Sequence, residues 1–144
     1  MLSKPRSRVL PLSSEIDVEE KSRSNEAIAQ ALISGVERGD IEGVLSLYHD
    51  DAVVWRNFDR RTLSREQFAK VVRFLVGAVD ELRYEDIVLQ ATATGFVQQH
   101  RLCGVAANGE AIDVAACMVA TCHHGRIQRL DEYLDSGELA ALMG

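Results

Sequence analysis

The second half of the chain reads as four consecutive strands joined by short turns, and this pattern limits the fold more than any other feature. The four segments are rich in β-branched and apolar residues and span residues 82–94, 96–106, 110–122 and 126–135. Turn residues separate them at Gly95, at Asn108-Gly109 and at His124-Gly125. Because Asn-Gly is a strong signal for a two-residue hairpin, the segments are expected to pair as an antiparallel meander.

Helical periodicity dominates the first half. Apolar residues recur at helical spacing in three segments, which span residues 24–38, 41–50 and 64–76. Ser64 and Gln67 have the form of a capping box that opens the third helix, and residues 52–58 predict a short strand. Residues 1–21 contain both prolines and predict a flexible N-terminal arm, which leaves 22–144 as a single domain.

The third long strand is apolar on both of its faces. Between Ala111 and Cys122, only Asp113 and Thr121 are strongly polar. An antiparallel sheet with one face in water should alternate, so both faces are expected to be covered. The helices can cover one face and a second copy of the chain the other, which predicts a homodimer through the sheet. Asp113 is expected at that interface, with the interior as the alternative.

Charge and composition exclude several classes of protein. The net charge of −6 argues against binding to nucleic acid or to an anionic membrane surface. There is no apolar run of about 18 residues that could span a membrane. The three cysteines indicate reduced thiols in a cytoplasmic protein. No cofactor-binding motif is present, and the spacing around Cys122-His123-His124 matches no metal site.

The order of these segments resembles the nuclear-transport-factor-2-like (NTF2-like) superfamily, which includes SnoaL-like polyketide cyclases, ketosteroid isomerases and limonene-epoxide hydrolases. The resemblance covers residues 22–140 and rests on SLYHDDAVVW, GFVQQHRLCG, the Asn108-Gly109 turn and GRIQRLDEYLDS. It implies an α+β cone, with three N-terminal helices packed on a strongly curved, mostly antiparallel sheet. In that superfamily the mouth of the cone holds an apolar small molecule.

The closest functional pattern is that of the limonene-epoxide hydrolases, in which an arginine lies between two acids while an aromatic residue and an asparagine position a water molecule. The resemblance places Trp55 and Asn57 at the aromatic and asparagine positions, Arg101 at the arginine and Glu132 at the base. Cys103 stands where the second acid would be. Epoxide hydrolysis is therefore one candidate reaction among several.

The direction of each side chain decides which residues reach the interior. If Leu130 and Leu134 face inward, Glu132 does too, and a carboxyl group in an apolar cavity has a raised pKa that suits a general base. Counting from Gly95 puts Arg101 inward, whereas one β-bulge would put His100 there. Met118 is expected in the core or in the cavity wall.

We therefore expect a cofactor-independent enzyme that performs acid–base chemistry on an apolar cyclic or aromatic metabolite. The reaction could be that of an isomerase, a cyclase, a lyase or an epoxide hydrolase. Glu132 would move a proton with help from Arg101 or His100, while Trp55, Asn57 and Met118 would contact the substrate or a water molecule. The alternative is a non-catalytic module that uses the same fold for small-molecule binding or dimerisation.

Overall fold

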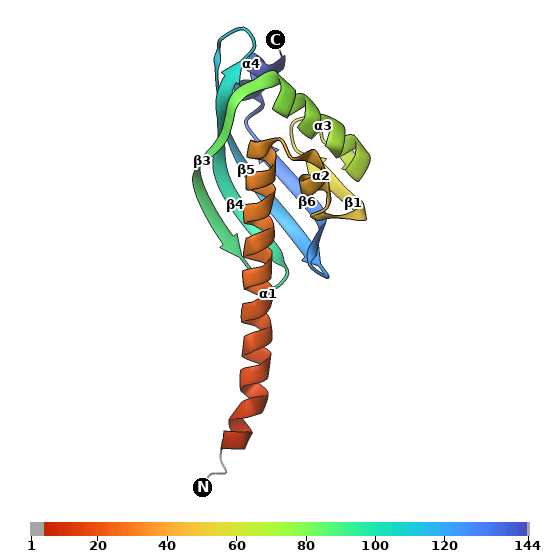
Figure 1. The fold of residues 1–144 in the computed structure, drawn as a ribbon, viewed down its shortest axis with the longest axis vertical. Helices are drawn as coiled ribbons and strands as arrows, with labels where there is room; N and C mark the ends of the chain where they lie inside the picture. The colour runs from red at the N-terminus through yellow and green to blue at the C-terminus, as the bar shows by residue number, and fades with distance from the viewer. Residues whose placement is uncertain (1–4, 144) are drawn as a thin grey trace.

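The computed structural model describes residues 5–143, which form a six-stranded sheet with helices packed on one face (Figure 1). The elements in chain order are α1 (Pro5–Arg38), α2 (Ile41–Leu45), β1 (Tyr48–Arg56), β2 (Thr62–Ser64), α3 (Arg65–Ala78), β3 (Val79–Ala91), β4 (Gly95–Ala106), β5 (Ala111–His123), β6 (Arg126–Leu134), the 3-10 helix η1 (Ser136–Leu139) and α4 (Ala140–Met143). This confirms the predicted α+β class.

The sheet has the strand order β2-β1-β6-β5-β4-β3. Strands β3 to β6 pair antiparallel in sequence order, as the meander pattern predicts, and β1 adds to β6 in parallel. His124 and Gly125 both have positive φ, at 49° and 77°, which suits a two-residue hairpin turn between β5 and β6. The β1–β6 pairing brings the first strand beside the last one.

The first two helices differ from the sequence prediction. Helix α1 runs back to Pro5 without a break near residue 21, and its N-terminal half projects away from the body (Figure 1). Helix α2 ends at Leu45 and not at residue 50, because the Leu47 carbonyl already accepts a hydrogen bond of 2.7 Å from the Ile127 N–H of β6. Tyr48 is consequently the first residue of a strand. Although α1 has 34 residues, neither it nor another described helix is apolar enough to cross a membrane.

Helix α3 begins where its cap predicts. The Ser64 hydroxyl accepts a hydrogen bond from the Gln67 N–H, and the Gln67 side chain accepts one from the Ser64 N–H. The helix buries Phe68, Ala69 and Val72 against the sheet. The main core therefore lies between the helices and the inner face of the sheet, which is the face that the helices cover.

Candidate active site

A cavity of about 390 Å³ lies between the inner face of the sheet, α3 and the C-terminal segment. Its walls are mostly apolar and include Phe58, Val71, Phe74, Leu75, Leu102, Val114, Ala116, Leu134, Leu139 and Leu142. The polar side chains that line it come from different elements and are Arg56, Lys70, Tyr84, His100 and Glu132. Cavities of this size and composition are typical of small-molecule sites.

The register of the sheet explains where the cavity lies. Ala116 on β5 is opposite His100 on β4 and Leu134 on β6. The next inward-facing residues along β5 are the larger Val114 and Met118. Because a methyl group fills much less volume than its neighbours do, the inner face is hollowed at Ala116. The polar groups of the site surround this hollow.

Glu132 faces the cavity, as the alternation of β6 predicts. Leu130 and Glu132 are on the same face as Leu134, since successive side chains of a strand point to opposite faces. No hydrogen bond to the Glu132 carboxyl group is found among the described residues. Burial raises its pKa, and the nearby Arg56 guanidinium partly opposes this effect. The carboxyl group is thus a stronger base than a glutamate in water.

His100 is the inward-facing residue of its pair, so the counting that put Arg101 inside is wrong. Strand β4 buries Phe96, Gln98 and His100 on the inner face, with 1%, 1% and 4% of each residue exposed. The β4–β5 register runs from Gly95 to Val105 without interruption, so no bulge is involved. The burial of the large Phe96 ring sets the direction of every later residue in the strand.

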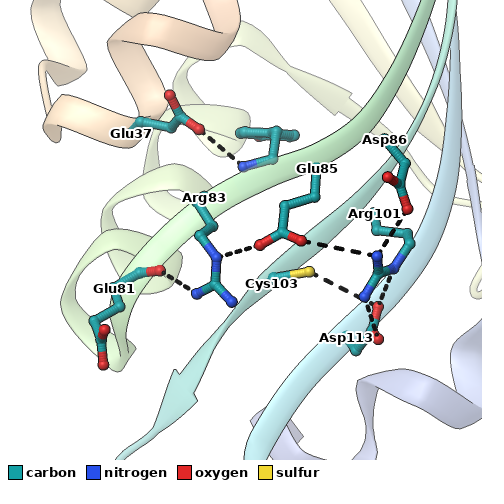
Figure 2. A network of polar contacts seen from close by, with 9 residues as sticks. Glu37, Glu81, Arg83, Glu85, Asp86, Arg101, Cys103 and Asp113 are labelled. Atoms are coloured by element: carbon teal, nitrogen blue, oxygen red, sulfur yellow. Dashed lines mark hydrogen bonds and ion pairs between the residues drawn. The ribbon is translucent and has the colours of Figure 1, made fainter.

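Arg101 lies on the outer face of the sheet. Its guanidinium donates to both carboxylate oxygens of Asp113, at 2.9 and 2.8 Å, and to Asp86 at 2.7 Å (Figure 2). Cys103 occupies the position where the limonene-epoxide hydrolase pattern has its second acid. It lies on the same outer side, with its Sγ 3.8 Å from a carboxylate oxygen of Asp113. Arg101 therefore cannot assist Glu132, and Asp113 lies outside the cavity.

Trp55 and Asn57 also face away from the cavity, which corrects their predicted role in binding a substrate there. Trp55 packs edge-on against Tyr133 of β6, with 5.3 Å between ring centres. Asn57 exchanges two hydrogen bonds with the main chain of Leu134, at 3.0 and 3.2 Å. The inward side chain between them is Arg56, which follows the buried Ala52 and Val54 of β1.

Met118 is a core residue. It is 3% exposed, packs in the main core cluster and lies opposite Glu132 in the β5–β6 register. Met118 is not among the residues that line the cavity, so the core alternative for Met118 holds. At the end of β5, no group of three His, Cys, Asp or Glu side chains in the described part of the chain is arranged to hold a metal ion.

The His100 imidazole is neutral near pH 7. Its burial lowers the pKa from 6.5 to about 4. The Gln98 side-chain nitrogen lies 3.0 Å from Nδ1 of His100, an arrangement in which Nδ1 accepts and the ring proton is on Nε2. His100 can then present an N–H donor to a bound molecule and is not itself the base.

Tyr84 is a site residue that the sequence did not reveal. Its ring packs edge-on against His100, with 4.7 Å between ring centres, and it lines the cavity. Burial raises its pKa, and the Glu132 carboxylate raises it further, so the phenol keeps its proton. Strand β3 has two register shifts, with positive φ at Glu81 and Asp86. Because each shift changes which residues face inward, strict alternation along the sequence does not predict that Tyr84 points into the cavity.

Comparison with known proteins agrees with this fold. A family model for the SnoaL-like domain matches residues 29–130. No match was found among curated proteins. Among solved structures, a proposed polyketide cyclase from Xanthomonas campestris pv. campestris superposes with a TM-score of 0.75 at 20% identity, covering 86% of this chain and 99% of that one.

Two further structures show the same architecture. A proposed isomerase from Bacillus subtilis has a TM-score of 0.74 at 11% identity and covers 86% of this chain and 95% of its own. An NTF2-like protein from Burkholderia xenovorans LB400 has a TM-score of 0.71 at 16% identity and covers 85% of this chain and 98% of its own. At such identities the similarity establishes the fold and leaves the reaction to be argued from the site.

Proposed function

Because the chain belongs to the SnoaL-like domain family of the NTF2-like superfamily, we propose that it is a cofactor-independent enzyme that moves a proton on an apolar cyclic or aromatic molecule. One observation carries the proposal: a single carboxyl group and two neutral hydrogen-bond donors line the same apolar cavity. The carboxyl group is that of Glu132, and the donors are Tyr84 and His100. This is the set of groups that proton abstraction next to a carbonyl group requires.

Each group has a definite part in such a reaction. The Glu132 carboxylate would take a proton from the carbon beside a substrate carbonyl, since its raised pKa makes it a stronger base. Negative charge would then develop on the carbonyl oxygen, where the Tyr84 O–H and the His100 Nε2–H can donate hydrogen bonds. Return of the proton to another carbon completes an isomerisation. In a cyclisation, the carbanion attacks a second carbonyl group of the substrate, and the proton held by Glu132 passes to the alkoxide oxygen that forms there, which restores the carboxylate.

The cavity favours these reactions over epoxide opening by a pair of acids. Among the described residues that line it, Glu132 is the only acid. The second acid of the limonene-epoxide hydrolase pattern has no counterpart in the cavity, and Arg101 faces the opposite side of the sheet. Isomerisation and cyclisation need only one group that transfers the proton. We therefore place them ahead of hydrolysis.

Replacing Glu132 by Gln tests the proposal. The assay follows a β,γ-unsaturated cyclic ketone, whose conjugated isomer absorbs in the ultraviolet. We expect turnover to fall by about 10²-fold or more, because the amide cannot accept the proton. Glu85→Gln, on the outer side of the sheet, is the matched control. Equal turnover in wild type and Glu132→Gln would remove Glu132 from the mechanism.

The second candidate is a non-catalytic binding module, which the mostly apolar cavity wall also favours. In that case, cyclic apolar ligands would raise the melting temperature of the protein without being converted, and Glu132→Gln would bind them as well as wild type does. Product formation by the wild type separates the two functions.

The homodimer through the sheet also stays a proposal. It is supported by apolar side chains exposed on the outer face, where Val97, Val119 and Tyr133 are 36%, 38% and 43% exposed. Groups of exposed apolar residues commonly mark interaction surfaces. Sedimentation equilibrium tests it, and a monomer mass across the micromolar range would refute it.

A further inference from the structure

Arg56 lies between two acids at the edge of the cavity. It is the last residue of β1, lines the cavity and stands opposite Glu132 in the β1–β6 register. Its guanidinium nevertheless binds Asp59, with Nε 3.2 Å from one carboxylate oxygen and a terminal nitrogen 2.6 Å from the other. The same guanidinium lies 4.7 Å from the centre of the Phe58 ring.

Asp59 is held in place by the turn that it belongs to. The Arg61 N–H donates to the same Asp59 oxygen that Nε of Arg56 contacts, at a distance of 3.1 Å. The hydrogen bonds from Arg56 lower the pKa of Asp59, so this carboxylate stays ionised. A bidentate contact of this kind uses the planar geometry of the Arg56 guanidinium and fixes the orientation of that group. Among the described residues, Arg56 makes no ion pair with Glu132.

We propose that Asp59 is a positioning residue: by holding the Arg56 guanidinium at the edge of the cavity, it keeps this cation from pairing with the Glu132 carboxylate and leaves that acid free to accept a proton. The inference rests on the proposed function of Glu132 as the base. A direct pair between Arg56 and Glu132 would stabilise the charged carboxylate, and an opposite charge at contact distance lowers a carboxyl pKa by about 1 to 3. A weaker base would follow.

Apart from Arg56, the groups around the Glu132 carboxyl group cannot set its charge environment in the same way. Those that face it or the same cavity are Tyr48, Arg56, Lys70, Tyr84 and His100. Both tyrosines keep their protons because burial raises the pKa of each, and His100 is neutral. Lys70 is exposed on α3. Arg56 is therefore the cation that acts on Glu132, and Asp59 decides where it points.

The test is a carbon-13 NMR titration of the Glu132 carboxyl group in the full chain, with its signal assigned from its loss in Glu132→Gln. In Asp59→Asn the apparent pKa of Glu132 should fall by about 1 or more, because Arg56 is released toward it. Asp59→Ala should give the same result if the asparagine variant folds poorly. Asp86→Asn, which removes an arginine partner on the outer face, is the matched control and should leave the titration unchanged.

A double-mutant cycle identifies Arg56 as the mediator. Arg56→Met should raise the pKa of Glu132, and adding Asp59→Asn to Arg56→Met should produce little further change. An unchanged Glu132 titration in Asp59→Asn, or an equal shift with and without Arg56, would overturn the proposal. The titration needs no substrate, so it fails or succeeds independently of turnover. If catalysis is also present, the acidic limb of the pH profile of kcat/KM should move to lower pH in Asp59→Asn.

Discussion

His100 should make the protein less stable in acid by an amount that follows from its burial. The imidazole is 4% exposed and burial lowers its pKa from 6.5 to about 4, so the unfolded chain takes up a proton at a pH where the folded one does not. Stability is complete above pH 6.5 and is lost as the pH falls through 6.5 towards 4. The gap between the two pKa values corresponds to about 3 kcal/mol of unfolding free energy.

Replacing His100 by Gln keeps a polar side chain beside Gln98 and removes the titrating imidazole. Urea unfolding followed by circular dichroism at pH 7.5, 6, 5 and 4 gives the free energy of each variant. Relative to the glutamine variant, the wild type should lose about 2 kcal/mol between pH 7.5 and 5 and about 3 kcal/mol by pH 4. The comparison between variants cancels the contribution of all other titrating groups.

His123→Gln is the matched control, since it removes an exposed imidazole at the end of β5. Parallel pH dependence of wild type and His100→Gln would contradict this prediction. It would mean that His100 binds the same number of protons in the folded and unfolded states. The effect of burial on the His100 pKa would then be absent, and the folded protein would protonate this imidazole near pH 6.5, as the unfolded chain does.

Two further predictions address the site directly. Tyr84→Phe keeps the ring that packs on His100 and removes only the hydroxyl group. In steady-state kinetics, kcat should therefore fall by about 10²-fold with little change in KM. An unchanged kcat would exclude Tyr84 as a donor. Arg101→Met should leave turnover unchanged in the same assay because the guanidinium lies on the outer face, and a loss comparable to that of Glu132→Gln would contradict this placement.

The sequence predicts the fold well where local signals are strong. The capping box at Ser64, the hairpin turn at His124-Gly125 and the antiparallel pairing of consecutive late strands each depend on residues or segments that are neighbours in sequence, and each is confirmed. It fails where a contact distant in sequence decides. The helical pattern of residues 41–50 is interrupted because Ile127 pairs with Leu47, and β2 has only three residues, too few for a pattern.

The candidate site is predicted less completely, because a strand with polar residues on both faces does not show which face is buried. Glu132 is placed correctly since Leu130 and Leu134 flank it on the same side. Arg101 and Trp55 are each misplaced by one position, which reverses the direction of the side chain. Tyr84 and Arg56 are missed altogether, the former behind the bulges of β3 and the latter beside a more conspicuous tryptophan.

Strand β6 carries charged residues on both of its faces, and the two faces hold them in different environments. On the outer face, Arg129 pairs with Asp131 at 2.8 Å, where both side chains are partly exposed. Glu132, one residue later, points to the other face and meets an apolar cavity. Asp131 and Glu132 are adjacent, but their side chains point to opposite faces of the strand. Asp131 forms an ion pair, whereas the Glu132 carboxyl group has no hydrogen-bond partner among the described residues. The proposed activity depends on this difference in environment. The activity should therefore persist when residues on the outer face are substituted, as long as Leu130 stays buried.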